Sequence, residues 1–225
     1  MAERTPVLLA WSGGKDAAWT LHVLRQHDDV DVVGLLTTVT RDDDRVSMQG
    51  IRRTVLQAQA RAAGLPLVEV MIPARCTNDD YERAMAAALA NAVQRWPGLR
   101  TMAFGDLFLE DIRAYRVQTL RKIDWDVLTP LFGADTATLA RQMIDGGLRA
   151  DLCCVDTQQL DARFAGHAFD SALLEALPTG IDPCGENGEF HTCVSAGPMF
   201  DAPLALVQGH TELRDGRFAF TDYDM

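Results

Sequence analysis

The stretch Pro6-Val7-Leu8-Leu9-Ala10-Trp11 runs directly into Ser12-Gly13-Gly14-Lys15-Asp16. Its first six residues are apolar and end at a turn signal, which predicts a short buried β-strand. The two glycines let the backbone turn tightly and present its N–H groups. A helix predicted over residues 16–26 adds a partial positive charge where it begins, Lys15 adds a full charge, and Ser12 adds a hydroxyl donor. The stretch therefore predicts a loop that binds the phosphates of a nucleotide.

Two better-known phosphate motifs are excluded by spacing. A Walker A loop needs a glycine separated by four residues from Gly-Lys, and Ser or Thr after the lysine. Leu9 and Asp16 occupy those two places, and the chain has no Gly-x-Gly-x-x-Gly. The remaining alternative is a plain strand–helix turn in which Asp16 is the N-cap.

Strands and helices alternate along the rest of the first half. Further strands are predicted over residues 30–39, 67–72, 101–104 and 126–131, and further helices over residues 49–63, 79–96 and 110–122. This alternation predicts an α/β fold, with a Rossmann-like parallel sheet and helices on both of its faces. Ligands of such sheets bind at the carboxyl ends of the strands, which is where the glycine loop lies.

The pattern changes near residue 132, so we expect an N-terminal domain over residues 1–132 and a smaller α+β, substrate-binding domain over residues 133–225. The second domain is predicted to contain helices over 135–146 and 171–177, a strand over 150–157, a polar glycine-rich loop over 178–189 and a hairpin over 205–223. The hairpin is indicated by the turn sequence Arg214-Asp215-Gly216.

Bulk composition narrows the class of protein. The 225 residues carry a formal net charge of −11, which argues against a nucleic-acid partner because such proteins usually show a basic surface. Five cysteines without a dense, even pattern favour a reducing compartment. The first residues show no signal peptide, and no apolar run is long enough to span a membrane. We therefore expect a cytoplasmic protein, with a homodimer as the default oligomeric state.

Five motifs together resemble one known family. They are Ser12-Gly13-Gly14-Lys15-Asp16, Met48-Gln49-Gly50-Ile51-Arg52-Arg53, Phe104-Gly105-Asp106-Leu107, Pro130-Leu131-Phe132-Gly133 and Asp182-Pro183-Cys184-Gly185-Glu186-Asn187-Gly188-Glu189-Phe190-His191-Thr192. This set resembles the diphthine–ammonia ligase (diphthamide synthase) family of the PP-loop ATP pyrophosphatases. The resemblance covers nearly the whole chain and implies a HUP-type ATP-binding domain followed by a smaller domain.

The resemblance also implies an enzyme, an ATP-dependent carboxylate–ammonia ligase. A carboxylate substrate attacks the α-phosphate of ATP and forms an acyl-adenylate and pyrophosphate. Ammonia then attacks the activated carbonyl and leaves an amide and AMP. ATP and Mg²⁺ are the implied cofactors, since the metal offsets the phosphate charge.

Residue roles follow from the same resemblance. The implied nucleotide ligands are Ser12, Gly13, Gly14, Lys15 and Asp16, with Arg52 or Arg53 reaching the phosphates or the substrate carboxylate. The alternative for the two arginines is a solvated helix face. Asp106 follows a predicted strand and is the candidate for holding Mg²⁺ or positioning ammonia, as is Glu110 four residues later. The alternative for Asp106 is a helix cap.

The C-terminal motif supplies the remaining implied catalytic groups. Glu186 or Glu189 would bind ammonium or take its proton, and His191 would share in that transfer. The implied substrate-binding residues are Gly185, Asn187, Gly188 and Thr192. The alternative is an acidic surface loop.

Three residues depart from the family pattern, and the form of the last motif, which ends in His191-Thr192, resembles a bacterial-type branch. Ala17 stands where Ser is common, Gln49 where His is common, and His191 where Glu is common. Bacteria are not known to make diphthamide, so the reaction type carries over while the acyl substrate stays open.

Two further functions stay open at the level of sequence. A PP-loop sulfur transferase would use Cys184 as a persulfide carrier. The cysteines do not form a zinc motif, because neither the Cys153-Cys154 pair nor the spacing of Cys184 and Cys193 suits zinc. A non-catalytic nucleotide sensor would bind ATP without releasing pyrophosphate.

Overall fold

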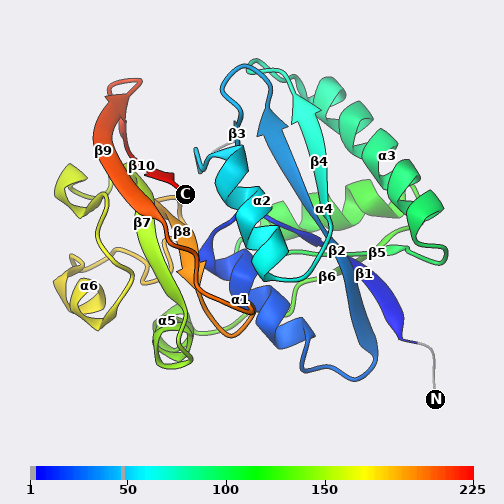
Figure 1. The fold of residues 1–225 in the computed structure, drawn as a ribbon, viewed down its shortest axis with the longest axis horizontal. Coiled ribbons are helices and arrows are strands. Elements are labelled where there is room, and N and C mark those ends of the chain that lie inside the picture. The colour runs from blue at the N-terminus through cyan, green and yellow to red at the C-terminus, as the bar shows by residue number, and fades with distance from the viewer. Residues whose placement is uncertain (1–3, 47–48) are drawn as a thin grey trace.

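The computed structural model describes residues 4–46 and 49–225 (Figure 1), so Met48 of the second motif lies outside the described residues. The N-terminal half of the described chain forms a mostly parallel sheet. Its strands are β1 (Thr5–Ala10), β2 (Val30–Thr40), β3 (Arg45–Val46), β4 (Leu67–Ile72), β5 (Thr101–Ala103) and β6 (Asp126–Leu128). The parallel strands are ordered β4-β2-β1-β5-β6, and β3 pairs antiparallel with the end of β2. The chain winds outward from β1 to β4 and then returns to the other side of β1, which creates a switch point between β1 and β5.

Helices cover both faces of this sheet, as the sequence predicts. They are α1 (Lys15–Leu24), α2 (Arg53–Ala62), α3 (Asn78–Arg95) and α4 (Glu110–Arg121). Alternate residues of β1 point to opposite faces, so Leu9 packs in a cluster with Leu21 of α1, while Leu8 packs in another cluster with Leu89 of α3 and Leu120 of α4. The predicted α/β fold class is therefore confirmed.

The C-terminal half forms a second, antiparallel sheet in the order β8-β7-β10-β9. Its elements are α5 (Thr136–Asp145), β7 (Arg149–Asp156), a 3₁₀ turn (Ala162–Phe164), α6 (Ser171–Ala176), β8 (Phe190–Ala196), β9 (Val207–Arg214) and β10 (Phe218–Asp224). The hairpin turns at Asp215 and Gly216, both with positive φ, as its sequence predicts.

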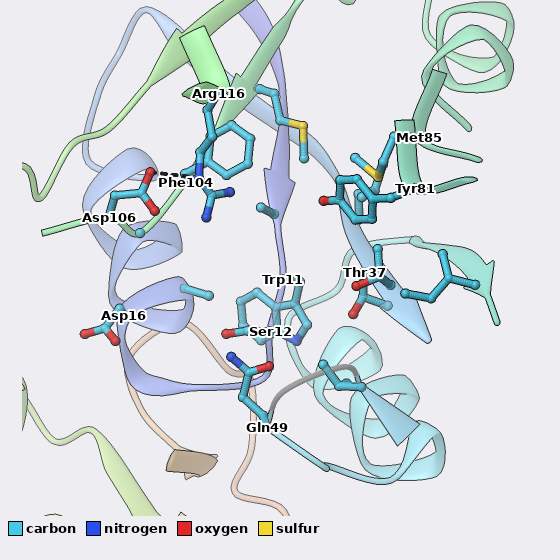
Figure 2. A pocket seen from close by; sticks show the side chains of 18 residues that line it. Trp11, Ser12, Asp16, Thr37, Gln49, Tyr81, Met85, Phe104, Asp106 and Arg116 are labelled. Atoms are coloured by element: carbon cyan, nitrogen blue, oxygen red, sulfur yellow. Dashed lines mark ion pairs between the residues drawn. The ribbon is translucent and has the colours of Figure 1, made fainter. Parts of the chain in front are cut away.

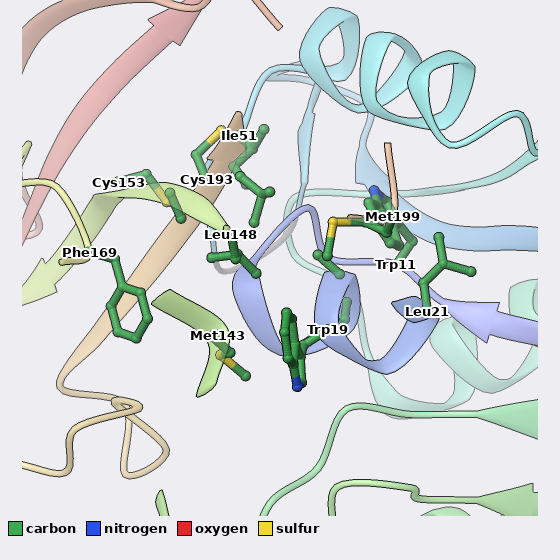
Figure 3. Packing of buried hydrophobic residues seen from close by; sticks show 14 of the residues in the cluster. Trp11, Trp19, Leu21, Ile51, Met143, Leu148, Cys153, Phe169, Cys193 and Met199 are labelled. Carbon is green, nitrogen blue, oxygen red and sulfur yellow. The ribbon is translucent and has the colours of Figure 1, made fainter. Parts of the chain in front are cut away.

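Helix α1 lies between the two sheets (Figure 1). One apolar core spans both halves of the chain, because Trp19 of α1 belongs to the same buried cluster as Met143 of α5 and Leu148 before β7 (Figure 3). Gly146 approaches Trp19 so closely that a Cβ would lie 2.5 Å from its ring. The two sheets therefore share their hydrophobic stabilisation through α1.

Several elements differ from the sequence prediction, which included neither β3 nor the 3₁₀ turn. The helix predicted over 49–63 begins only at Arg53, because Gly50 takes a positive φ of 68° and packs against Phe220. The backbone of Arg52 is extended and forms an isolated antiparallel β-bridge with Arg45. Strand β8 was not predicted.

Candidate functional site

The glycine loop lies between β1 and α1, where the sequence places it. Gly14 is the N-cap of α1 in extended conformation, and Asp16 lies inside the helix. The alternative in which Asp16 caps the helix is therefore wrong.

Both glycines are required by close neighbours. Gly13 has a φ of +81°, and a Cβ there would lie 2.8 Å from Leu56 Cδ2 and 2.9 Å from Gln59 Oε1. A Cβ on Gly14 would lie 3.1 Å from the carbonyl oxygen of Thr192. Side chains at these positions would force the loop away from α2 and β8.

Gln59 of α2 supports the loop from behind, a role that the sequence does not reveal. It is fully buried. Its Nε2 donates to the carbonyl oxygens of Gly13 at 3.0 Å and of Val194 at 2.8 Å. Its Oε1 accepts from Trp11 Nε1 at 3.0 Å. The backbone N–H of Val194 also donates to Gly13 at 3.0 Å, so β8 of the second sheet fixes the shape of the loop.

A pocket of about 420 Å³ opens in front of the loop, at the carboxyl ends of β1, β2 and β5 (Figure 2). Its lining includes Trp11, Ser12, Asp16, Leu36, Thr37, Val46, Gln49, Ile72, Tyr81, Met85, Phe104, Gly105, Asp106 and Arg116. Figure 2 shows Asp16, Asp106 and Arg116 towards one end of the pocket and Thr37, Tyr81 and Met85 towards the other, mainly apolar end. The volume is typical of a small-molecule site.

Thr37 of β2 leaves a hydrogen-bonding group unused in this pocket. The residue is 2 % exposed, and its Oγ1 has no hydrogen-bond partner among the described residues. A buried hydroxyl without a partner costs free energy, so a ligand that bonds to it would gain affinity. The sequence gives no signal for Thr37, because Thr is ordinary in a strand.

Asp106 lies at the polar end, 8 % exposed, with Oδ2 3.1 Å from Arg116 Nε. The guanidinium of Arg116 stacks on Phe104 at 4.1 Å from the ring centroid. Burial raises the pKa of Asp106, although the positive charges of Arg116 and Arg113 partly offset this effect. The helix-cap alternative for Asp106 is wrong, because Leu109 is the N-cap of α4. The sequence predictions missed Arg116.

Because Gly105 has no side chain, the motif at residues 104–107 can approach the glycine loop closely. A Cβ on Gly105 would lie 2.8 Å from the carbonyl carbon of Asp16 and 3.0 Å from the nitrogen of Ala17. The end of β5 therefore sits directly against the first turn of α1. Glu110, at the start of α4, does not line the pocket.

Lys15 does not line the pocket, and its side chain is buried. It is 2 % exposed, and its Nζ contacts the Asp16 carboxylate at 2.8 Å and the carbonyl oxygen of Cys184. The ammonium also lies 5.6 Å from the ring centroids of Phe169 and Phe190. Burial lowers the pKa of Lys15, but the charge and hydrogen bond of Asp16, together with the charges of Cys184 and Glu186, outweigh burial, so the net pKa is raised.

The two arginines of the second motif are not brought to the pocket. Arg52 pairs with Asp222 and Asp224 of β10, and Arg53 pairs with Glu69 of β4. Both side chains are partly exposed, at 39 % and 34 %. In the described structure these ion pairs connect the start of α2 to β10 and to β4.

The residues of segment 182–192 are buried or half-buried except Asn187, which is exposed, so the acidic-surface-loop alternative is wrong. Glu186 Oε1 accepts from the backbone N–H of Leu107 at 2.8 Å, and burial raises the pKa of Glu186. Gly133 donates to the carbonyl oxygen of Leu107 at 2.7 Å. Three of the sequence motifs thus meet at Leu107.

Glu189 shapes this segment internally. It is 2 % exposed, and its Oε1 accepts from the backbone N–H of Asp182 and from Asn187 Nδ2, both at 3.0 Å. Its Oε2 has no hydrogen-bond partner among the described residues. Gly185 has a φ of +70°, and a Cβ there would lie 2.8 Å from the carbonyl oxygen of Phe190.

His191 and Thr192 are the second and third residues of strand β8. Thr192 Oγ1 accepts from the backbone N–H of Lys15 at 3.0 Å, which fixes the start of α1. Burial, together with the charge of Lys15, lowers the pKa of His191 to about 4. His191 is therefore neutral near pH 7. Gly188 has a φ of +83° with open space around it.

The predicted Mg²⁺ site fits only an ion shared with phosphates. Among residues 4–46 and 49–225, no cluster of three or more metal-ligating side chains is present. Asp16 and Asp106 both line the pocket, and Asp106 Oδ2 accepts no hydrogen bond there. One or two carboxylates with substrate phosphates are the usual ligands of Mg²⁺.

The cysteines are poorly placed for sulfur chemistry. Cys184 is 1 % exposed, and burial raises the pKa of its thiol to about 12. Cys153 and Cys193 are buried in the shared core (Figure 3). Because the thiolate is the reactive form, this environment disfavours the sulfur-transferase alternative.

None of the described helices has the length and apolar character needed to cross a membrane.

An open parallel sheet with a glycine loop at its switch point is the arrangement of nucleotide-binding α/β proteins, and the fold places this chain in that class. Residues 5–121 match the family model described as diphthamide synthase N-terminal domain, and residues 135–219 match the one described as diphthamide synthase C-terminal domain. The chain therefore belongs to the diphthamide synthase family, which confirms the family part of the resemblance.

A curated relative is the protein named diphthine–ammonia ligase of Schizosaccharomyces pombe (strain 972 / ATCC 24843). The two are 26% identical over an alignment of 213 residues, and the alignment covers 87% of this chain. The match spans only 35% of the relative's own length.

Proposed function

We propose that this protein is an ATP-dependent ligase that adenylates a carboxylate and transfers the acyl group to ammonia, with release of AMP and pyrophosphate. Its family and the name of the yeast relative support this reaction type. The observation that carries it is the pocket in front of the glycine loop, which joins apolar side chains to Ser12 of the loop and to Arg116. We keep the bacterial-type branch as part of the proposal, on the basis of His191-Thr192, and the acyl substrate stays open.

The pocket suits a nucleotide lying along it. The adenine ring would lie at the apolar end, where Leu36 and Ile72 supply contacts and Thr37 supplies the free hydroxyl. The phosphates would lie over Ser12 and the first turn of α1, whose backbone N–H groups and dipole favour anions. Mg²⁺ bound with ATP would be held by Asp16 and Asp106 and would offset phosphate charge.

Arg116 is the proposed cation for the reacting groups. Its guanidinium faces the pocket next to Asp106 (Figure 2), and its planar donors suit the oxygens of a carboxylate or a phosphate. Adenylation brings two anions together, so a fixed positive charge between them would stabilise the transition state.

The proposed roles of Lys15, Glu186, Glu189 and His191 divide by position. Glu186 lies between the backbone of Leu107 and Lys15, and its raised pKa suits a group that accepts a proton from ammonium. Glu186 does not itself line the pocket, and neither do Glu189 and His191. We propose that Glu189 and His191, with Lys15, hold the glycine loop and the segment 182–192 in their positions relative to each other.

The same reasoning assigns positioning roles to other predicted residues. Arg52 and Arg53 act on the start of α2 through their ion pairs. The glycines and polar residues of the C-terminal motif, Gly185, Asn187, Gly188 and Thr192, are proposed to form the substrate side of the loop. Domains divided near residue 132 fit this proposal, since the two sheets lie on either side of that position.

Product analysis tests the function directly. The protein is incubated with ATP, Mg²⁺ and ammonium, with and without small carboxylic acids or cell extract, and AMP is separated from ADP. We expect AMP and pyrophosphate only when a suitable acid is present. Formation of ADP and phosphate would contradict the proposal, and nucleotide binding without turnover under every condition would favour the sensor.

A matched pair of variants sharpens the test. Arg116→Gln should reduce AMP formation at least tenfold, since mutations of charged groups at developing charge cost on the order of 10²-fold or more. Arg121→Gln, an exposed arginine on the same helix, should leave the rate unchanged.

A further inference from the structure

A second hollow lies on the outer face of the N-terminal sheet, between α3 and α4. It has a volume of about 470 Å³ and is lined mainly by apolar side chains. Four of these are large and unusually exposed for their type: Tyr81 at 36 %, Ile112 at 40 %, Tyr115 at 46 % and Ile123 at 43 %. We call this hollow the α3–α4 groove. Clustered exposed apolar residues mark binding sites more often than chance.

The groove adjoins the glycine-loop pocket, and the two cavities share a wall. Tyr81, Met85, Met102, Phe104 and Arg116 line both cavities. Figure 2 shows Tyr81 and Met85 on one side of the pocket and Phe104 with Arg116 on another. A ligand in the groove would therefore reach the nucleotide pocket across a single layer of side chains.

The shared wall includes the guanidinium of Arg116, whose hydrogen-bonding capacity is not fully used. Arg116 Nε is buried and has no hydrogen-bond partner of good geometry among the described residues, although Asp106 Oδ2 lies 3.1 Å away. Phe104 covers one face of the guanidinium and holds it at the junction. A guanidinium in this state suits a carboxylate, which accepts two parallel hydrogen bonds.

We propose that the α3–α4 groove binds the apolar chain of the carboxylate substrate and that Arg116 binds its carboxylate at the junction with the nucleotide pocket. This inference rests on the proposed ligase function and adds the class of acid: a monocarboxylate with an aliphatic or arylalkyl chain. Polar groups stand mainly at the rim, where Glu82 accepts from the Tyr115 hydroxyl at 3.2 Å and Lys122 is exposed. The floor, which includes Leu89 and Leu120, offers no partner to a second charge.

Chain length is the first measurable consequence. Butanoate, hexanoate, octanoate and 3-phenylpropionate are titrated into the nucleotide-free protein and into the protein with ATP, by calorimetry. Each methylene that enters the groove should tighten binding about two- to fourfold. Succinate, with a second charge, should bind at least tenfold more weakly than hexanoate. Equal affinity along the series would overturn the proposal.

Matched variants localise the binding. Ile112 lines the groove and does not line the nucleotide pocket. Ile112→Asp should weaken octanoate at least tenfold and leave ATP affinity unchanged. Leu213→Asp, on β9 and 60 % exposed, is the control and should change neither. If both variants bound octanoate like the unaltered protein, the groove would not be the acid site.

The readouts separate this inference from the proposed function. Octanoate binding that depends on Ile112, without AMP formation from any acid, would support the site and sink the ligase reaction. AMP formation from acids with no dependence on Ile112 would support the ligase and sink the groove. No binding of any monocarboxylate, with cross-linking of a polypeptide to a photoreactive group at residue 112, would replace the proposal by a protein partner.

Discussion

At the scale of single residues, the glycine loop is defined by what surrounds it as much as by its own sequence. Gly13 combines a positive φ with contacts to Leu56 and Gln59. Gly98 offers a contrast, because its φ is +85° and nothing lies within 4 Å of a Cβ there. Both positions require a positive φ, but only Gly98 has space for a side chain.

We therefore expect Gly13→Ala and Gly98→Ala to differ strongly. Gly98→Ala carries only the cost of left-handed backbone, about 1 kcal/mol of unfolding free energy. Gly13→Ala adds overpacking of about 1–3 kcal/mol and should lower ATP affinity at least tenfold. Urea unfolding and titration with a fluorescent ATP analogue measure both effects. Similar losses in the two variants would show that the contacts to Leu56 and Gln59 are unimportant.

The position of Lys15 has a direct chemical test, because Lys15 and Lys122 are the chain's two lysines. Lys15 is buried at 2 % exposure and paired with Asp16, whereas Lys122 is exposed. We expect acetic anhydride to modify Lys122 rapidly and Lys15 only after unfolding, as read by mass spectrometry of peptides. Rapid modification of Lys15 in the folded protein would contradict its placement, and faster modification on adding ATP would show that the side chain turns toward the phosphates.

At the scale of elements, ion pairs join α2 to the C-terminal sheet. Arg52 and Arg45 both contact Asp222 of β10. The hydrogen bonds from Arg52, together with Arg45, hold the pKa of Asp222 well below its ordinary value of 3.8, despite partial burial. The unfolded chain then binds this proton more readily than the folded one, so the stabilisation exists above pH 4 and is lost as pH falls below it.

We expect Asp222→Asn to flatten the acid dependence of stability. In urea unfolding between pH 6 and pH 3, the unaltered protein should lose about 1 kcal/mol more than the variant, a modest value because Arg52 is partly exposed. Asp224→Asn is the control, since Asp224 is 53 % exposed and 3.3 Å from Arg52. An unchanged pH slope in Asp222→Asn would show that the pair contributes nothing to stability.

The order of elements could be predicted from sequence, because strand and helix periods differ and the glycine loop marks a strand–helix turn. Strand β8 could not, since Phe190–Ala196 follows a motif that reads as a loop and pairs with β7, which is distant in sequence. The helix start at Arg53 was missed because Phe220 sets the conformation of Gly50. Tertiary contacts determine the structure at such positions, and a local sequence pattern gives no information about these contacts.

The candidate site shows the same limit. The sequence identified Ser12, Asp16 and Asp106, which line the pocket. It missed Thr37 and Arg116, because an ordinary strand threonine and a helix arginine carry no motif. It also expected Lys15 at the phosphates, whereas in the described structure the side chain contacts Asp16 and Cys184.

At the scale of the whole molecule, the two sheets are interdependent. Val194 and Thr192 of β8 bond to Gly13 and to the backbone of Lys15, and α1 is covered by the second sheet and α5. A chain with two family domains thus has one shared core. Removal of the second sheet would expose the apolar face of α1 and leave the glycine loop without its support from behind.

We therefore expect residues 1–132 alone to lack both cooperative unfolding and nucleotide affinity, because the shared core supplies much of the apolar burial. Co-expression with residues 133–225 should restore both, if the halves associate through α1. Near-ultraviolet circular dichroism and titration with a fluorescent ATP analogue measure the outcome. A fragment that unfolds cooperatively and binds ATP like the full chain would show that the N-terminal half is an independent domain. In that case the bonds from β8 to Gly13 and Lys15 would serve a step later than nucleotide binding, such as the attack of ammonia.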